Sequence, residues 1–119
     1  MTTTDRPDAD LVDGVLAALA DPTRRELLDV LSGRGQATAT TIAAELPVSR
    51  QAVVKHLAVL DTAGLVESTK VGREVRFSVR PEALDTTARW MAALAADWDR
   101  RLGRIKRLAE AAEAAARDA

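Results

Sequence analysis

The sequence predicts a mainly α-helical fold with one β-hairpin, and three observations support this prediction. Apolar residues recur at helical spacing through most of the chain, as in the i, i+4, i+8 series Leu11, Val15 and Leu19. Helix-start and helix-stop residues separate these stretches, and the two segments that flank Gly72-Arg73 alternate as strands do. Aromatic residues make up only 3% of the chain, so the core depends on aliphatic side chains, which suit closely packed helices.

The length of 119 residues suits one domain. We expect a disordered leader at residues 1–9 and a single domain over residues 10–116. The start of the chain lacks the basic and apolar regions of a signal peptide, and no apolar run approaches the roughly 20 residues of a membrane span. The chain has no Cys, which excludes disulfides and thiolate metal sites. These features predict a cytoplasmic protein with no membrane contact.

Two helices are expected in the first third of the chain. The first covers about residues 10–20. Asp21 and Pro22 then start the second, because an Asp side chain accepts hydrogen bonds from the first free N–H groups and Pro at the first helical position loses none. We expect Gly33 and Gly35 to stop the second helix.

A short helix and a longer helix are expected next. Thr38 or Thr40 can cap the short helix, and Ser49 caps the longer one, which covers residues 50–63 and ends before Gly64. The face of the longer helix that is expected to pack on the core carries Ala52, Val53, Leu57 and Leu60.

The segments at 65–71 and 74–79 predict a β-hairpin that turns at Gly72-Arg73. In its second strand, Val75, Phe77 and Val79 are expected to face inward. Pro81 then opens a final helical stretch that continues almost to the end of the chain.

The order of short helix, tight turn, longer helix and hairpin predicts a winged helix-turn-helix, in which the longer helix enters the major groove of duplex DNA. The small residues Ala43 and Ala44 allow the two helices to approach closely, and Val48 fills the turn between them. We therefore expect the outer face at the start of the 50–63 helix to contact DNA.

This face carries the side-chain types that read bases. Arg50 can pair with guanine, Gln51 with adenine, and Val54 can contact a thymine methyl group. The other polar positions of the face suit phosphates, or in the last case a base edge: Ser49, Lys55 and His56. An ordinary solvated helix face is the alternative, which the preceding short helix and the following hairpin make less favourable.

Basic residues also mark the hairpin. Lys70, Arg73 and Arg76 lie near its tip and outer face, and such a tip can enter a minor groove. Edge protection against strand addition is the alternative role for these charges. The net charge of the chain is only −1, but residues 49–80 hold six Lys and Arg against three Asp and Glu. Arg73, in the turn, is the wing residue most expected to contact DNA.

Four segments together resemble the ArsR-type winged-helix repressors. They are ALADPTRR at 18–25, PVSRQAVVKHL at 47–57, AGLV at 63–66 and GREVRF at 72–77. The resemblance covers roughly residues 10–110 and implies a homodimeric repressor that binds an inverted-repeat operator and often regulates its own operon. It places the recognition helix on the positions from Ser49 to His56 and the wing on Lys70 to Arg76.

The final helix carries a partial heptad seam. Leu84, Met91, Trp98 and Ile105 recur every seven residues, and Leu94 and Leu108 fall at the complementary position. We expect the first helix and the same helix of a second subunit to cover this seam, which would set two recognition helices roughly 34 Å apart. Packing within the monomer is the alternative. The predicted dimerisation residues are Leu11, Val15, Met91, Leu94, Trp98, Ile105 and Leu108.

Other classes of function find little support. Metal-sensing members of the resembled family use Cys, or His with carboxylates, whereas this chain has no Cys and one His. It is therefore similar to the metal-independent branch, and we expect no metal site and no cofactor. Without a converging nucleophile, His base and carboxylate, we also expect no enzyme activity. The alternative function is a protein–protein interaction module that kept the fold and lost DNA binding, and no inducer is assigned.

Overall fold

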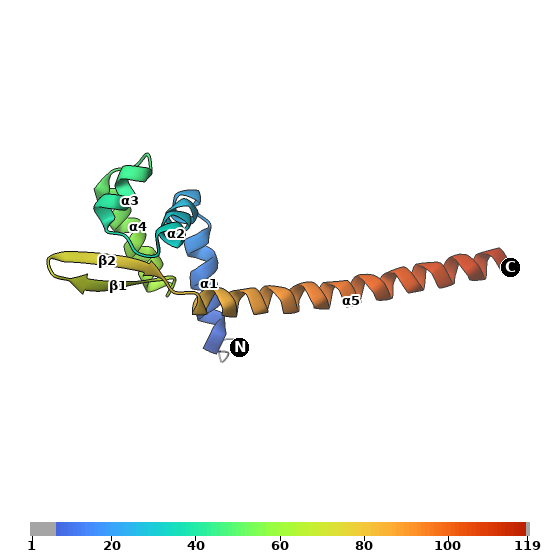
Figure 1. Cartoon of the computed structure of the whole chain (residues 1–119). Coiled ribbons are helices and arrows are strands. Elements are labelled where there is room, and N and C mark those ends of the chain that lie inside the picture. Colours follow the sequence, from blue (N-terminus) through green and yellow to red (C-terminus); the bar gives the residue numbers. More distant parts are fainter. Residues whose placement is uncertain (1–6, 119) are drawn as a thin grey trace. The chain divides into compact units, whose positions relative to one another are not determined.

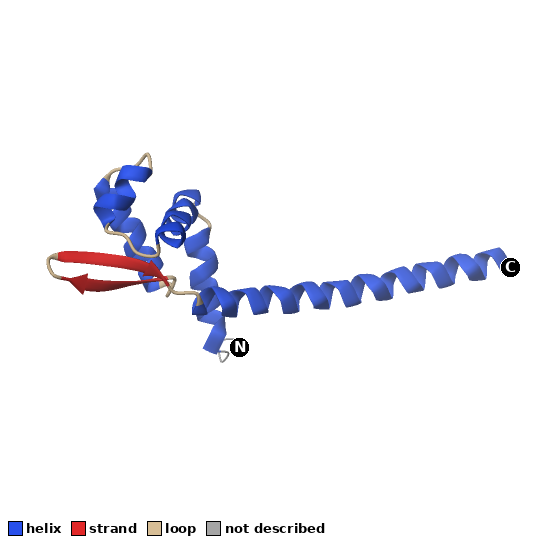
Figure 2. Ribbon diagram, in the orientation of Figure 1, coloured by secondary structure: helices blue, strands red, loops and turns tan. Residues whose placement is uncertain are grey.

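The computed structural model describes residues 7–118, so residues 1–6 of the predicted leader lie outside the described part. Residues 7–9 belong to the first helix, which begins before its predicted start at residue 10. The elements over the described residues appear in Figures 1 and 2: α1 (Pro7–Leu19), α2 (Pro22–Arg34), α3 (Ala39–Glu45), α4 (Arg50–Thr62), β1 (Val66–Val71), β2 (Glu74–Val79) and α5 (Glu82–Asp118).

The chain forms two compact units, one ending at Thr87 and the other beginning at Ala88. In the first unit, side chains from α1 to β1 and from the start of α5 form one apolar core. Its largest fully buried side chains are Val15, Leu27, Leu31, Ile42, Val53, Leu57, Leu60, Leu65 and Val66. Each such burial contributes about 1.5–3 kcal/mol, so aliphatic side chains stabilise this small unit without large aromatic residues.

Side-chain caps fix where the helices of the first unit begin. Asp21 accepts a hydrogen bond from the Thr23 N–H at 2.8 Å and starts α2. Thr38, rather than Thr40, caps α3 by accepting from the Thr41 N–H, and Ser49 caps α4 by accepting from the Ala52 N–H. The predicted helix starts at Pro22 and Arg50 are thereby confirmed.

Glycine residues end two of these helices. α2 continues through Gly33 and ends at Arg34, so the prediction that Gly33 stops it is wrong, while Gly35 takes the cap with φ of +81°. After α4, Gly64 has φ of +80°, and the Leu65 N–H donates to the Leu60 carbonyl. The Gly64 N–H donates to Asp61, which completes a Schellman motif and turns the chain directly into β1.

The hairpin pairs β1 with β2 antiparallel, with Val66 opposite Val79 and Val71 opposite Glu74. Gly72 has φ of +64° and no residue other than glycine has positive φ in the described chain, which matches a two-residue type II′ turn at Gly72-Arg73. Phe77 exchanges two backbone hydrogen bonds with Ala37, and this attaches the wing to the segment that precedes α3.

One prediction for the hairpin is wrong. Val75 is 44% exposed, although the alternating pattern assigned it to the inner face with Phe77 and Val79. Phe77 and Val79 are half-buried and pack against the core. Val75 lies nearer the tip, paired with Lys70, where the hairpin extends past the core and no apolar element covers it.

The second unit is the remainder of α5, an uninterrupted helix to Asp118. From Ala88 onward, all of its described residues are exposed except Asp97 and Gly103, which are half-buried. Its large apolar side chains are therefore exposed to solvent in the single chain.

Candidate nucleic-acid interface

The α3-turn-α4 segment presents one face of α4 to solvent. Val53, Leu57 and Leu60 anchor the opposite face in the core. Ala43, Leu46 and Val48 of α3 and the turn pack against the same core, as the predicted helix-turn-helix requires. Over the first turns of α4 the exposed side chains are Arg50, Gln51, Val54 and Lys55, and the capping residue Ser49 is exposed as well.

These predicted reading residues do not all have free side chains. Gln51, Val54 and Lys55 are exposed, and their side chains have no hydrogen-bond or ion-pair partner among the described residues. Arg50 is different, because its Nε donates a hydrogen bond of 3.1 Å to Oγ1 of Thr40 at the start of α3. Sequence reasoning considered Thr40 only as a cap, since nothing in the spacing of residues 40 and 50 indicates that the two side chains meet.

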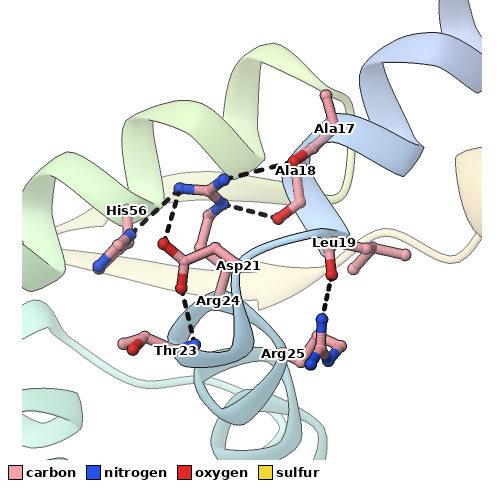
Figure 3. A network of polar contacts seen from close by, with 8 residues as sticks. All are labelled: Ala17, Ala18, Leu19, Asp21, Thr23, Arg24, Arg25 and His56. Carbon is pink, nitrogen blue, oxygen red and sulfur yellow. Dashed lines mark hydrogen bonds and ion pairs between the residues drawn. The ribbon is translucent and has the colours of Figure 1, made fainter.

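His56 is not on the open face. It is half-buried, and its Nδ1 lies 3.4 Å from Nη1 of Arg24 on α2 (Figure 3). Its position on α4 explains this, because it is three residues after Val53 and four before Leu60, beside the buried stripe. His56 therefore contacts Arg24 at the corner between the end of α1 and the start of α2, and its contact with DNA stays a prediction.

Arg24 is the centre of that corner and was not singled out from the sequence. Its Nε donates to the Ala18 carbonyl at 2.6 Å, and its Nη1 lies 3.5 Å from the Asp21 carboxylate (Figure 3). Arg25 donates to the Leu19 carbonyl. The two arginines thus satisfy carbonyls at the end of α1 that have no partner within the helix.

The same corner predicts a pH effect on stability. The hydrogen bond from the Thr23 N–H, assisted by Arg24, lowers the pKa of Asp21 below its ordinary value of 3.8. A carboxyl group with a lower pKa in the folded state stabilises above its unfolded pKa, and this contribution is lost as the pH falls through the folded pKa. We expect Asp21→Asn, which keeps a capping side chain, to be less stable than wild type at neutral pH.

Thermal unfolding of the two proteins at about pH 6 and about pH 3 measures this effect. The difference between their midpoints is expected to shrink in acid. An equal difference at both pH values would contradict the assignment, since it would come from something other than the Asp21 charge.

The basic residues of the wing do not share one face. Lys70 is paired with Val75 on the face that carries Phe77, whereas Arg76 is paired with Thr69 on the other face. Arg76 is also engaged, because its guanidinium donates to the Glu74 carboxylate at 3.0 Å. Arg73, in the turn, is exposed and has no hydrogen-bond or ion-pair partner within the described chain.

A cleft separates the start of α4 from the wing. It has a volume of about 630 Å³. Its α3 and α4 side includes Thr40, Arg50 and Val54, and its wing side includes Arg73, Glu74 and Val75. We call this feature the wing cleft.

The predicted dimerisation residues fall into two groups. In the first unit, Leu11 is half-buried against the core and Val15 is 0% exposed. Val15 is thus a core residue of its own chain, and its assignment to a dimer surface is corrected, because the inner stripe of α1 already packs on α2 and α4.

In the second unit the predicted seam is exposed throughout. Trp98 is 51% and Leu108 65% exposed. Leu102, at the position after Arg101, extends the apolar stripe and was not predicted. Arg101 lies with its guanidinium carbon 5.2 Å from the Trp98 ring centroid and forms an ion pair of 3.1 Å with Asp97. The other exposed members of the stripe are Met91, Leu94 and Ile105.

No group of three or more His, Cys, Asp or Glu side chains is placed to hold a metal ion within residues 7–118. None of the helices in that part of the chain has the length and apolar composition needed to cross a membrane.

Known proteins resemble this chain in sequence and in fold. Residues 19–69 match the model of a helix-turn-helix domain family. The transcriptional repressor SdpR of Bacillus subtilis is 32% identical over 80 residues, which cover 67% of this chain and 88% of SdpR.

Solved structures agree with the sequence relatives. An ArsR-like transcriptional regulator from Rhodococcus sp. RHA1 is 48% identical, with a TM-score of 0.76 over 83% of this chain and 92% of its own. A homodimeric winged helix-turn-helix DNA-binding domain from Mycobacterium bovis, described as a possible ArsR-family regulator, is 27% identical, with a TM-score of 0.61 over 78% and 86% of the two chains. The chain therefore belongs to the ArsR family of winged helix-turn-helix transcriptional regulators, which bind DNA.

Proposed function

We propose that this regulator is a homodimeric repressor that binds an inverted-repeat operator in duplex DNA. The observation that carries the proposal is the exposed face of α4, on which Gln51, Val54 and Lys55 have no partner within the described chain while Val53 and Leu57 anchor the helix from below. A helix that is rigidly anchored and polar at its exposed N-terminal end suits insertion into a major groove.

The chemistry of the exposed residues at the start of α4 suggests their roles. Gln51 hydrogen-bonds to an adenine edge, and Val54 contacts a thymine methyl group. Lys55 and Ser49 contact phosphates, which position the helix without reading sequence. Arg73, at the tip of the wing, enters the adjacent minor groove, and Lys70 contacts the backbone beside it.

Dimerisation supplies the second half of the site. The exposed stripe on the second unit, from Met91 through Trp98 to Leu108, is the surface that we assign to a second copy. An amphipathic helix gains most of its stability from packing of its apolar face. An exposed apolar stripe therefore favours packing against a second copy of the chain. The homodimeric state of the M. bovis domain and the repressor activity named for SdpR support this assembly and this direction of control.

The proposal places the protein in the cytoplasm, where it controls transcription and has no catalytic activity. The relatives are transcriptional regulators, which supports a binding function. Regulation of its own operon is part of the proposal.

Binding to selected DNA tests the proposal. Wild-type protein would be used to select duplexes from a randomised library, and affinity for the selected duplex would be compared with that for a random duplex of equal length. We expect a clear preference and a steep loss of affinity as salt rises, because several phosphates are neutralised. Equal, weak binding to both duplexes would instead favour the protein–protein interaction module.

Two substitutions on α4 distinguish a residue that reads bases from a residue that contacts phosphates. We expect Gln51→Ala to reduce affinity for the selected duplex by about 5- to 100-fold and to relax the base preference at one position, since a bidentate contact to a base is lost. We expect Lys55→Ala to weaken binding to both duplexes similarly. Fluorescence anisotropy measures both. If Gln51→Ala kept the full preference, Gln51 would not be a reading residue.

A further inference from the structure

The wing cleft lies between the two elements that the proposed function assigns to different grooves. Its α3–α4 wall includes Thr40, Arg50 and Val54, and its wing wall includes Arg73. In duplex DNA a sugar–phosphate backbone forms the ridge between the major and the minor groove. If α4 enters the major groove and the wing the minor groove, a backbone strand must pass between them, at the position of this cleft.

Arg50 lines this cleft and is bound to α3. Its Nε donates to Thr40 Oγ1 at 3.1 Å, and its two Nη groups have no hydrogen-bond partner within the described residues. The Nη groups can donate to a phosphate while the bond to Thr40 stays in place, whereas a guanine contact through Nε would break that bond. In this orientation Arg50 lines the wing cleft.

We propose that Arg50 and Thr40 together bind a backbone phosphate of the DNA in the wing cleft, and that Arg50 does not read a base. This inference rests on the proposed function. The Thr40 hydroxyl accepts from Arg50 Nε and has its own hydrogen free to donate to a phosphate oxygen. The Nη groups of Arg50 donate to the same phosphate with charge assistance, and Arg73 lines the opposite wall.

A carboxylate in the cleft does not oppose this assignment. Glu74 lines the wing wall, where its negative charge would repel a phosphate. Its Oε1, however, accepts hydrogen bonds from Nε and Nη2 of Arg76 at 3.2 and 3.0 Å. The pair is neutral as a unit, so the net charge of the cleft walls comes from Arg50 and Arg73.

The test compares phosphate binding with base reading. Binding of wild type, Arg50→Ala, Arg50→Lys and Thr40→Val would be measured against the selected duplex and a random duplex over a series of salt concentrations. Thr62→Val is the matched control, because Thr62 is an exposed threonine at the far end of α4, outside the wing cleft, whose hydroxyl donates to the Ala58 carbonyl. Circular dichroism checks that each variant is folded.

A phosphate contact predicts four results. Arg50→Ala weakens binding to both duplexes by about the same factor, roughly 10-fold, and reduces the slope of log affinity against log salt by about 0.9. Arg50→Lys restores the slope. Thr40→Val weakens binding to both duplexes several-fold with the slope unchanged, and Thr62→Val binds as wild type does.

Other results would overturn the inference without affecting the proposed function. Loss of preference for the selected duplex in Arg50→Ala, with an unchanged slope and unchanged binding to random DNA, would make Arg50 a base-reading residue. Wild-type binding by Thr40→Val would remove Thr40 from the contact. Failure of the proposed function is distinct, because wild type itself would then show no preference for any selected duplex.

Discussion

Trp98→Glu is expected to convert the protein to a monomer that binds operator DNA about 100-fold or more weakly than wild type. Trp98 is at the centre of the exposed stripe of α5 and is 51% exposed in the single chain. If a second copy covers this ring, a carboxylate at the same position is left unpaired in an apolar interface, which is strongly unfavourable. A monomer then binds only one half-site and loses the gain from joint engagement of two.

Sedimentation velocity and fluorescence anisotropy on the same samples measure both effects. Ala96→Glu is the control, because it adds the same charge to an exposed position about 160° around the helix from Trp98. It is expected to remain dimeric. A Trp98→Glu protein that stays dimeric would place the dimer interface elsewhere, and a monomer with wild-type affinity would show that one half-site suffices.

The boundaries of the fold were predictable wherever local chemistry decides them. Asp21 and Ser49 each cap a helix by bonding to N–H groups two or three residues away, and Gly64 and Gly72 adopt positive φ that other residues rarely adopt. Gly33 shows the limit of this reasoning. A glycine costs a helix only about 1 kcal/mol, so α2 continues through it to a better cap at Gly35.

The candidate site was predictable as a surface but not in its side-chain contacts. The period of α4 separates Gln51 and Lys55 from the buried Leu57 without reference to any other element. The contact between His56 and Arg24 joins residues 32 apart in sequence, and that between Arg50 and Thr40 joins residues ten apart. Both depend on how α4 packs against α2 and α3, which periodicity does not specify.

The same limit explains why Val15 and Val75 were assigned to the wrong surface. Val15 has the right spacing for either the core or a dimer stripe, and the packing of α1 within its own chain decides for the core. Val75 continues the alternation of Phe77, but alternation does not indicate where the covering core ends. Period alone identifies which residues share a face, and burial depends on what lies opposite.

Leu57→Ala is expected to destabilise the first unit by about 2–5 kcal/mol, the largest stability effect that we predict for a single substitution. Leu57 is 1% exposed in the core and lies on the same helix as the proposed reading residues. Truncation removes buried methyl groups and leaves a cavity that the neighbouring side chains, Leu60 among them, fill only in part. The thermal midpoint is expected to fall by at least about 10 °C.

Lys55→Ala, two residues earlier on the same helix, is the matched comparison. Its side chain is exposed, so stability is expected to change by less than about 0.5 kcal/mol while DNA affinity falls. Leu57→Ala is expected to show the reverse. At a temperature where this variant remains folded, its affinity for DNA is expected to be near normal, because Leu57 is buried and does not contact DNA. Loss of affinity in a folded Leu57→Ala protein would mean that the position of α4, and not only its exposed side chains, depends on this one contact with the core.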